Sequence, residues 1–177
     1  EAIHCEWPHE IMGPTDNGMW NQWWAYDNVR NVNQLIEKLN SSVLFTEEKK
    51  TELLAEAHAI RAWYYFGMVK RYGGGTFIET PQVYDPDNLE ALLVSRNTEE
   101  ESYNFILKDL NYAIENLPKE RVASEKYRMN RFSAAALKTR AMLFAASIAK
   151  YGTYDKNGVV GFDDPNKAKE YYEEGIS

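Results

Sequence analysis

The residues best suited to chemistry in this sequence lie in one short segment, from Asp16 to Tyr26. It holds three tryptophans within five residues, with asparagine, glutamine and aspartate beside them. Flat aromatic faces pack against the C–H faces of sugar rings, while amide and carboxylate groups bond to sugar hydroxyls. The segment therefore predicts contact with a carbohydrate. Its candidate ligand-binding residues are Asp16, Asn17, Trp20, Asn21, Trp23 and Trp24.

Core packing is the alternative role for these tryptophans. Trp23 and Trp24 adjoin a helical pattern, and a tryptophan at a helix entrance commonly fills the core. For these two residues packing is the favoured interpretation. Trp20 lies in a predicted loop, where binding residues concentrate, so both roles stay open for it.

No other part of the sequence offers a catalytic or metal-binding set. His4, His9 and His58 share no metal-ligand spacing, and His58 lies in an alanine-rich helical pattern, where we expect a structural role with one hydrogen bond. The acidic segments 85–88 and 155–158 lack the glycine and glutamate positions of a helix–loop–helix calcium site. We therefore predict no catalytic residue, no metal and no cofactor.

Composition and charge bound the class of protein. The chain has 177 residues, 44% of them hydrophobic and 14% aromatic, which suits one globular domain spanning 1–177. A net charge of −7 argues against a nucleic acid as partner, because that affinity rests on clustered Lys and Arg. No apolar run approaches the roughly 20 residues of a membrane span. As given, the chain is predicted to be soluble.

The single cysteine, Cys5, limits covalent chemistry. It excludes an intrachain disulfide and any paired-cysteine metal or redox site. A lipid-anchor cysteine follows an apolar run, and only four residues precede this one. We interpret Cys5 as a buried or free thiol.

Helical periodicity predicts the elements that must position the candidate residues. Helices are expected over 23–39, from 47 to about 72 with Thr46 as cap, after Thr98 to Leu117, over 134–151 with Ser133 as cap, and from Pro165 onward. Three glycines at 73–75 should end the second helix. A long connection follows over 76–97, with a short extended piece predicted at 76–79. Arg61, inside an apolar helix, must bond a carboxylate or loop carbonyls.

The order of these elements predicts stacked helical hairpins. In each pair the second helix is rich in alanine and aromatic residues, the pattern of tetratricopeptide-type repeats, although the period is irregular. The fold class expected is all-α, with tetratricopeptide-like hairpins and long irregular loops. The last helix lacks a pair of its own, and one repeat helix cannot bury its apolar stripe alone. We therefore expect the chain to be a fragment of a longer protein.

Four pieces of the sequence, in order, resemble the SusD/RagB family of nutrient-uptake lipoproteins. They are Trp23 through Tyr26 and Asn33 to Leu35-Ile36; Glu56 to Gly74 with Arg61-Ala62 and Arg71-Tyr72-Gly73-Gly74; Arg96-Asn97-Thr98 leading to Asp109-Leu110 and Leu117-Pro118; and Arg131-Phe132-Ser133 leading to Ala135-Ala136-Leu137 and Ala141. Order and spacing agree from about residue 20 to 151. Gly75 departs from the pattern, because the family often has Val or Ile there.

The resemblance implies a surface glycan-binding subunit without catalysis. Such a protein sits on the outer face of the outer membrane by a lipid anchor, which would lie outside this fragment. It delivers oligosaccharide to a SusC-like TonB-dependent transporter, its expected partner. The alternatives are a helical-repeat scaffold that binds proteins and no sugar, and, third, an enzyme.

Overall fold

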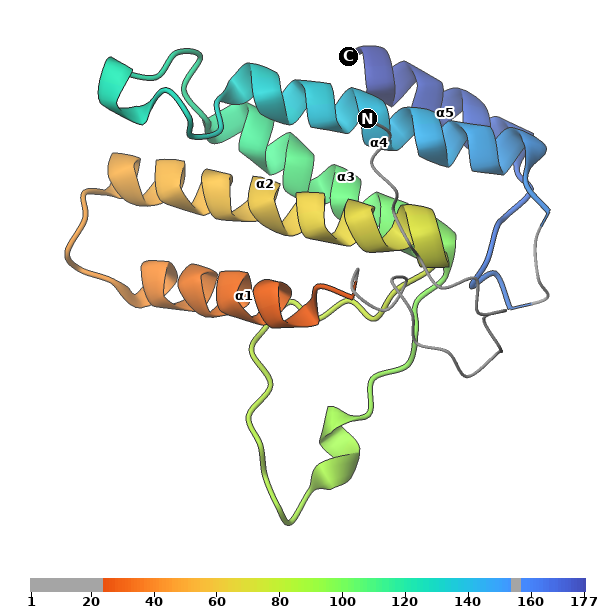
Figure 1. Cartoon of the computed structure of the whole chain (residues 1–177), viewed down its shortest axis with the longest axis horizontal. Helices are drawn as coiled ribbons and strands as arrows, with labels where there is room; N and C mark the ends of the chain where they lie inside the picture. The colour runs from red at the N-terminus through yellow and green to blue at the C-terminus, as the bar shows by residue number, and fades with distance from the viewer. Residues whose placement is uncertain (1–23, 154–156) are drawn as a thin grey trace, which may run out of the picture.

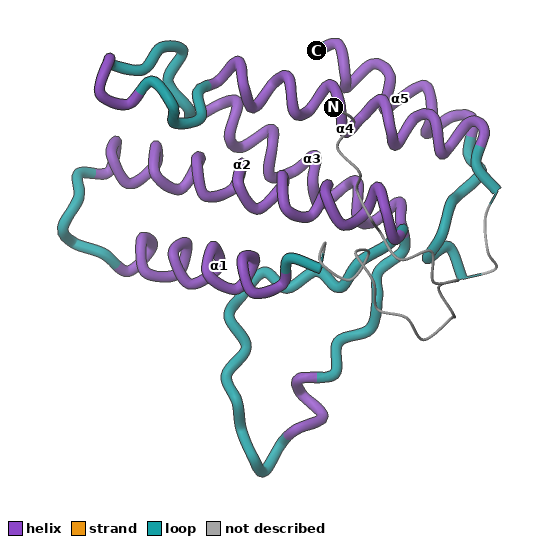
Figure 2. Tube along the Cα trace, viewed as in Figure 1, coloured by secondary structure: helices purple, strands orange, loops and turns teal. Residues whose placement is uncertain are grey.

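The computed structural model describes residues 24–153 and 157–177, which form five α-helices and no β-strand (Figure 2). The helices are α1 (Tyr26–Ser41), α2 (Glu47–Tyr72), α3 (Glu99–Asn116), α4 (Arg131–Tyr151) and α5 (Pro165–Ile176). Two short 3-10 turns, η2 (Leu89–Leu92) and η3 (Ala123–Glu125), lie in the connections. The predicted all-α fold is confirmed.

Each helix runs antiparallel to the one before it and packs against it (Figure 1). α1 pairs with α2, α3 pairs with α4, and α5 packs along α4. α2 is central, because α1 and α3 lie on either side of it and α4 also touches it. The long connection between α2 and α3 extends away from the bundle beside α1 (Figure 1). This arrangement is the predicted stack of tetratricopeptide-like hairpins.

The sequence of α2 explains its central place. Thr46 caps the helix by accepting a hydrogen bond from the Lys49 N–H, as expected. Buried alanines on two faces of α2 allow close approach of neighbouring helices; they are Ala55, Ala57, Ala59 and Ala62. Gly73 ends the helix with φ of 75°, a backbone conformation that glycine takes readily.

The starts of α3 and α4 are set by reciprocal caps. Thr98 and Glu101 form the predicted capping box at α3. At α4 the prediction of Ser133 as cap is wrong, because Asn130 caps the helix by accepting from the Ser133 N–H. Ser133 Oγ in turn accepts from the Asn130 N–H, so the helix begins at Arg131. The first predicted helix also begins later than expected, at Tyr26 instead of Trp23.

α5 buries its apolar face, contrary to the expectation that it would lack a partner. It begins at Pro165 as predicted, with Asp164 as cap. Ala168 and Tyr171 are buried in the main core with residues of α4. The Tyr171 hydroxyl donates a hydrogen bond to Asn104 Oδ1 on α3 (2.8 Å). Among the helices that the structure describes, none is both long and apolar enough to cross a membrane.

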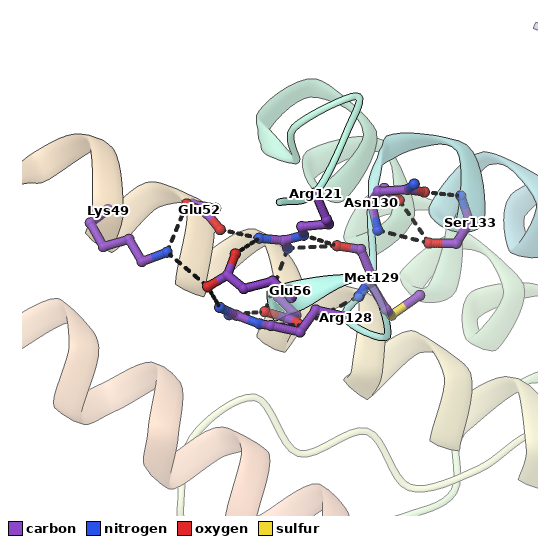
Figure 3. Close-up of polar contacts among 9 residues, drawn as sticks. Lys49, Glu52, Glu56, Arg121, Arg128, Met129, Asn130 and Ser133 are labelled. Atoms are coloured by element: carbon purple, nitrogen blue, oxygen red, sulfur yellow. Dashed lines mark hydrogen bonds and ion pairs between the residues drawn. The ribbon is translucent and has the colours of Figure 1, made fainter. Parts of the chain in front are cut away.

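Charged side chains join α2 to the connection between α3 and α4 (Figure 3). Arg121 donates to the Met129 carbonyl through Nε (2.8 Å) and pairs with Glu52. Arg128 pairs with Glu56. The Arg121 side chain is almost fully buried, so its contacts are shielded from water.

Replacing Arg121 by methionine should lower the free energy of unfolding by about 1.5–3 kcal/mol, because charged hydrogen bonds contribute about that much. Urea titration followed by circular dichroism measures the loss. Lys49→Met is the matched control, since Lys49 contacts Glu52 and Glu125 from a more exposed position. A loss no larger than that of the control would contradict the role given to Arg121.

Candidate functional site

Trp24, Tyr26 and Tyr72 form an aromatic stack where α1 begins and α2 ends. The rings of Trp24 and Tyr72 are nearly parallel, 11° apart, with centroids at 4.1 Å. The Trp24 and Tyr26 rings lie at 10° with centroids at 5.8 Å. Trp24 is 36% exposed, so its ring lies at the surface. The sequence favoured core packing for Trp24, and the structure does not place it in the core.

The other predicted ligand-binding residues lie outside the described part of the chain. They are Asp16, Asn17, Trp20, Asn21 and Trp23. Trp24 is the first residue that the structure describes. The assignment of the preceding segment to a ligand therefore stays a prediction.

Beside the aromatic stack a hollow of about 170 Å³ opens between α1 and the long connection. We call it the α1 hollow; its walls include Tyr26, Asp27, Arg30, Asn33, Pro81 and Gln82. Pockets that enclose a whole drug-sized ligand measure about 300–1,000 Å³. The α1 hollow is smaller and suits one sugar unit, with carboxylate, guanidinium and amide groups available to its hydroxyls.

The start of the long connection forms one wall of the α1 hollow, and hydrogen bonds hold it against α1 and α2. The Thr76 N–H donates to the Tyr26 hydroxyl (2.9 Å), and the Ile78 N–H donates to the Tyr65 hydroxyl (2.9 Å). Asn33 Nδ2 donates to the Ile78 carbonyl. The start of the connection is thus fixed to both α1 and α2. The extended piece predicted at 76–79 forms no β-strand.

A buried ion pair and its hydrogen bonds join α1, α2 and α3 beneath this wall. Arg61 on α2 donates to both carboxylate oxygens of Asp109 on α3, through Nε and Nη2, each at 2.8 Å. Its Nη1 donates to Asn33 Oδ1 on α1 (2.9 Å). Arg61 is 3% exposed and Asp109 is 1% exposed. The carboxylate partner expected for Arg61 is confirmed.

His58 completes this cluster. Its Nδ1 lies 2.7 Å from Asp109 Oδ1, so the tautomer with a proton on Nδ1 donates to the carboxylate. The structural role expected for His58 agrees with this contact. Burial would raise the pKa of Asp109, but the hydrogen bonds from Arg61 and His58 outweigh it and hold that pKa below its ordinary value.

A second set of contacts joins the end of α2 to the start of α3. Gly74 is buried, and its N–H donates to the Val159 carbonyl (2.6 Å). Arg96 Nε donates to the Gly74 carbonyl (2.8 Å), which ties the end of the long connection to α2. Buried Glu99 accepts from the Gly161 N–H (2.6 Å). Burial raises the pKa of Glu99, and the Gly161 hydrogen bond opposes that rise only partly.

A larger hollow of about 590 Å³ lies farther along α1, but its chemistry is less suited to a sugar. His58 is its sole ring apart from Pro81, and polar residues such as Glu37 and Glu79 make up much of the lining. It offers no indole or phenol face for stacking. Within 24–153 and 157–177, no group of three His, Cys, Asp or Glu residues could hold a metal ion.

Sequence reasoning missed Tyr72, Asp27, Arg30 and Gln82 as candidate site residues, and it left Tyr26 out of the candidate ligand-binding residues. The spacing of Tyr26, Arg30 and Asn33 at i, i+4 and i+7 places them on one face of a helix, which is a usable signal. No comparable signal exists for Tyr72 or Gln82, because their places depend on how α2 and the long connection pack.

Comparisons of the sequence with known proteins all lead to one family. Residues 4–143 match the SusD-like family described as "Starch-binding associating with outer membrane". A SusD-like protein of Bacteroides ovatus is 30% identical over 142 residues, which cover 79% of this chain and 24% of that protein. SusD-like protein P2 of Formosa agariphila is 34% identical over 106 residues, covering 58% of this chain and 20% of that one.

Solved structures agree with the sequence comparison. A SusD-like protein of Bacteroides fragilis superposes with a TM-score of 0.65 and 36% identity, covering 78% of this chain and 26% of that one. A laminarin-binding SusD-like protein gives a TM-score of 0.63 and 29% identity, with 72% and 27% covered. This chain therefore spans about a quarter of the length of the relatives that it matches.

Proposed function

Because this chain belongs to the SusD-like family, we propose that it is part of a non-catalytic cell-surface protein that binds oligosaccharide. The family is described as starch-binding and associated with the outer membrane. Its members therefore bind polysaccharide at a cell surface. For this chain, the proposal names the residues that bind the sugar and the transporter that receives it.

The observation that carries the proposal is the aromatic stack beside the α1 hollow. Trp24 is partly exposed in the stack. Tyr26, which also belongs to the stack, lines the α1 hollow together with the hydrogen-bonding groups of Asp27, Arg30 and Gln82. Sugars need this combination of a flat apolar face and polar groups. The segment 16–23, which precedes Trp24 directly, carries the same two kinds of residue.

The solved relatives support an oligosaccharide as the class of ligand. One is described as laminarin-binding, and another, 28% identical with a TM-score of 0.61, was determined with a xylogluco-oligosaccharide. These ligands belong to those proteins. They make neutral oligosaccharides the first probes for this one.

We further propose that the whole protein is held at the outer membrane by a lipid anchor and delivers its ligand to a SusC-like TonB-dependent transporter. The family's outer-membrane association supports this placement. Co-purification of the full-length protein with a transporter from detergent-solubilised outer membranes tests the partnership. Recovery of the protein without any transporter would count against it.

Replacing Trp24 by alanine should weaken oligosaccharide binding about tenfold or more, because a buried aromatic contact commonly contributes 2 kcal/mol or more. The loss should grow when Trp20 is also replaced. Isothermal titration of the full-length protein with laminarin and xyloglucan oligosaccharides measures both effects.

Tyr127→Ala is the matched control, since Tyr127 is an exposed aromatic residue on the connection between α3 and α4, far from the stack along the chain. It should bind as the unchanged protein does. If no glycan in a broad panel binds the full-length protein, and the Trp20 and Trp24 variants are equally silent, the function is wrong.

The second candidate function is a protein-binding helical scaffold without sugar affinity. Exposed apolar side chains on α4 favour it, because a contact surface needs such residues; they are Phe132, Leu143 and Phe144. Capture of a protein partner by a form that binds no glycan would support this alternative over the first.

A further inference from the structure

A third hollow, of about 440 Å³, lies over α2 and is lined from the start of α1 and from α4 as well. We call it the basic groove; the residues that matter in it are Asn28, Trp63, Gly67, Lys70, Arg71 and Arg140. Figure 1 shows α2 crossing between α1 and α4 with α3 behind it. The groove falls within the usual size range of ligand pockets.

The charge of the basic groove is opposite to that of the chain. Lys70, Arg71 and Arg140 line it, and none of the described lining residues is acidic, whereas the whole chain carries −7. Burial, followed by the like charges of Arg71 and Arg140, lowers the pKa of Lys70. Lys70 and Arg140 thus repel each other across the groove, and an anion bound between them would relieve that repulsion.

One face of α2 adds aromatic surface to these cations. Trp63, Gly67 and Lys70 stand at i, i+4 and i+7, so they follow one another along the helix. Trp63 is 55% exposed, so much of its ring is open to a ligand. The Lys70 ammonium lies 5.2 Å from the centre of the Phe66 ring, which holds it over the groove floor.

Gly67 is unusual because no packing in the described structure requires it. A Cβ added there would meet only Arg71 Nη1, at 4.0 Å. Glycine inside a helix costs about 1 kcal/mol relative to alanine. The missing side chain leaves room in the groove floor, where the Gly67 carbonyl accepts a hydrogen bond from Arg71 Nη1 (2.6 Å).

We propose that the basic groove binds an anionic sugar unit, a uronate or a sulfated residue, of the oligosaccharide that the protein takes up. This inference rests on the proposed function and adds the chemical class of the ligand. Trp63 stacks on the sugar ring, and Arg140 and Lys70 bind its carboxylate or sulfate oxygens. The absence of a side chain at Gly67 gives the ring room to approach α2.

The test compares matched ligands on the full-length protein. Isothermal titration uses oligogalacturonide, its carboxyl-reduced neutral counterpart, a sulfated galactan oligosaccharide, and inorganic sulfate alone. We expect at least one anionic oligosaccharide to bind about tenfold more tightly than the neutral counterpart, with affinity falling as salt rises. Inorganic sulfate should bind far more weakly, since it lacks the ring that stacks on Trp63.

Variants locate the site. Arg140→Gln and Trp63→Ala should each weaken binding of the anionic oligosaccharide about tenfold, and Arg140→Lys should restore part of it. Gly67→Ala should weaken binding while leaving the protein as stable or more stable. Lys169→Gln removes the same charge from an exposed position on α5 and should have no effect.

The outcomes separate this inference from the function beneath it. Preference for the uronate identifies a carboxylate as the anion, and preference for the galactan identifies a sulfate; either supports the groove if the variants respond. Equal affinity for charged and neutral oligosaccharides, or unchanged binding in the variants, overturns the groove but leaves glycan binding intact. Binding of inorganic sulfate as tightly as the oligosaccharides also overturns it. Failure to bind any glycan removes the proposed function itself.

Discussion

Replacing Asp109 by asparagine will lower the free energy of unfolding by about 3–5 kcal/mol, the usual cost of removing one partner from a buried ion pair. The substitution keeps the shape of the side chain but removes its negative charge, so the buried Arg61 guanidinium, 3% exposed, keeps only neutral acceptors such as Asn33 Oδ1. An arginine side chain stays charged in proteins, so losing a proton cannot relieve the penalty. Urea titration of the full-length protein measures the change.

Arg61→Met should cost less than Asp109→Asn. Without Arg61, the Asp109 carboxyl keeps the His58 contact and can take up a proton, so no bare charge need stay buried. The double variant Arg61→Met with Asp109→Leu should regain much of the stability, because it leaves neither charge behind. A double variant that is as unstable as the sum of Arg61→Met and Asp109→Leu made singly would contradict this account.

Acidification provides an independent check on Asp109. Its pKa in the folded state is depressed, so its stabilising contribution is fully present above its unfolded pKa of about 3.9 and is lost as pH falls through the folded value. The unchanged protein should therefore lose stability below about pH 4 more steeply than Asp109→Asn does. Equal slopes for the two proteins would show that the carboxylate is not the titrating group.

Replacing Gly74 by alanine should destabilise the fold by about 3 kcal/mol, near the upper end of the usual cost of overpacking. An added Cβ would collide with the Asn97 carbonyl oxygen and lie 2.7 Å from the Thr98 carbonyl carbon and 2.9 Å from the Glu99 nitrogen. All three atoms belong to the backbone at the start of α3, so no side chain can move aside. Thermal and urea unfolding measure the loss.

Gly67→Ala is the matched control, with the same chemical change inside α2, seven residues before Gly74. Its Cβ would make only an ordinary contact, with Arg71 Nη1 at 4.0 Å, so we expect a gain of up to about 1 kcal/mol from the better helix propensity of alanine. Similar losses in both variants would show that contact with the backbone at the start of α3 does not decide the effect at Gly74.

Local chemistry made most of the helices predictable. The capping boxes, the glycine after Tyr72 and the proline at the start of α5 act through neighbouring residues, so they leave signals in the sequence itself. The misplaced cap of α4 has the same origin. Both Asn130 and Ser133 are good capping residues, and the choice between them depends on which backbone conformation the preceding connection takes.

The candidate site was predictable only in part. Trp24 could be singled out from its neighbours in the chain, but whether its ring faces the core or the surface depends on Tyr72, which lies 48 positions away along the sequence and stacks on it. Gln82 and the basic groove are brought to their places by the packing of separate elements. Periodicity carries no information about such distant contacts.

The sequence by itself determined the helical class, the pairing of neighbouring helices, the need of Arg61 for a carboxylate or loop carbonyls and the family to which the chain is similar. Tertiary structure alone decided that the carboxylate is Asp109, that α5 packs on α4, and that three cations gather beside Trp63. The physical reason is the range of the interactions involved. Capping and periodicity act within a few residues, whereas ion pairs, stacked rings and grooves form only when distant segments are brought together.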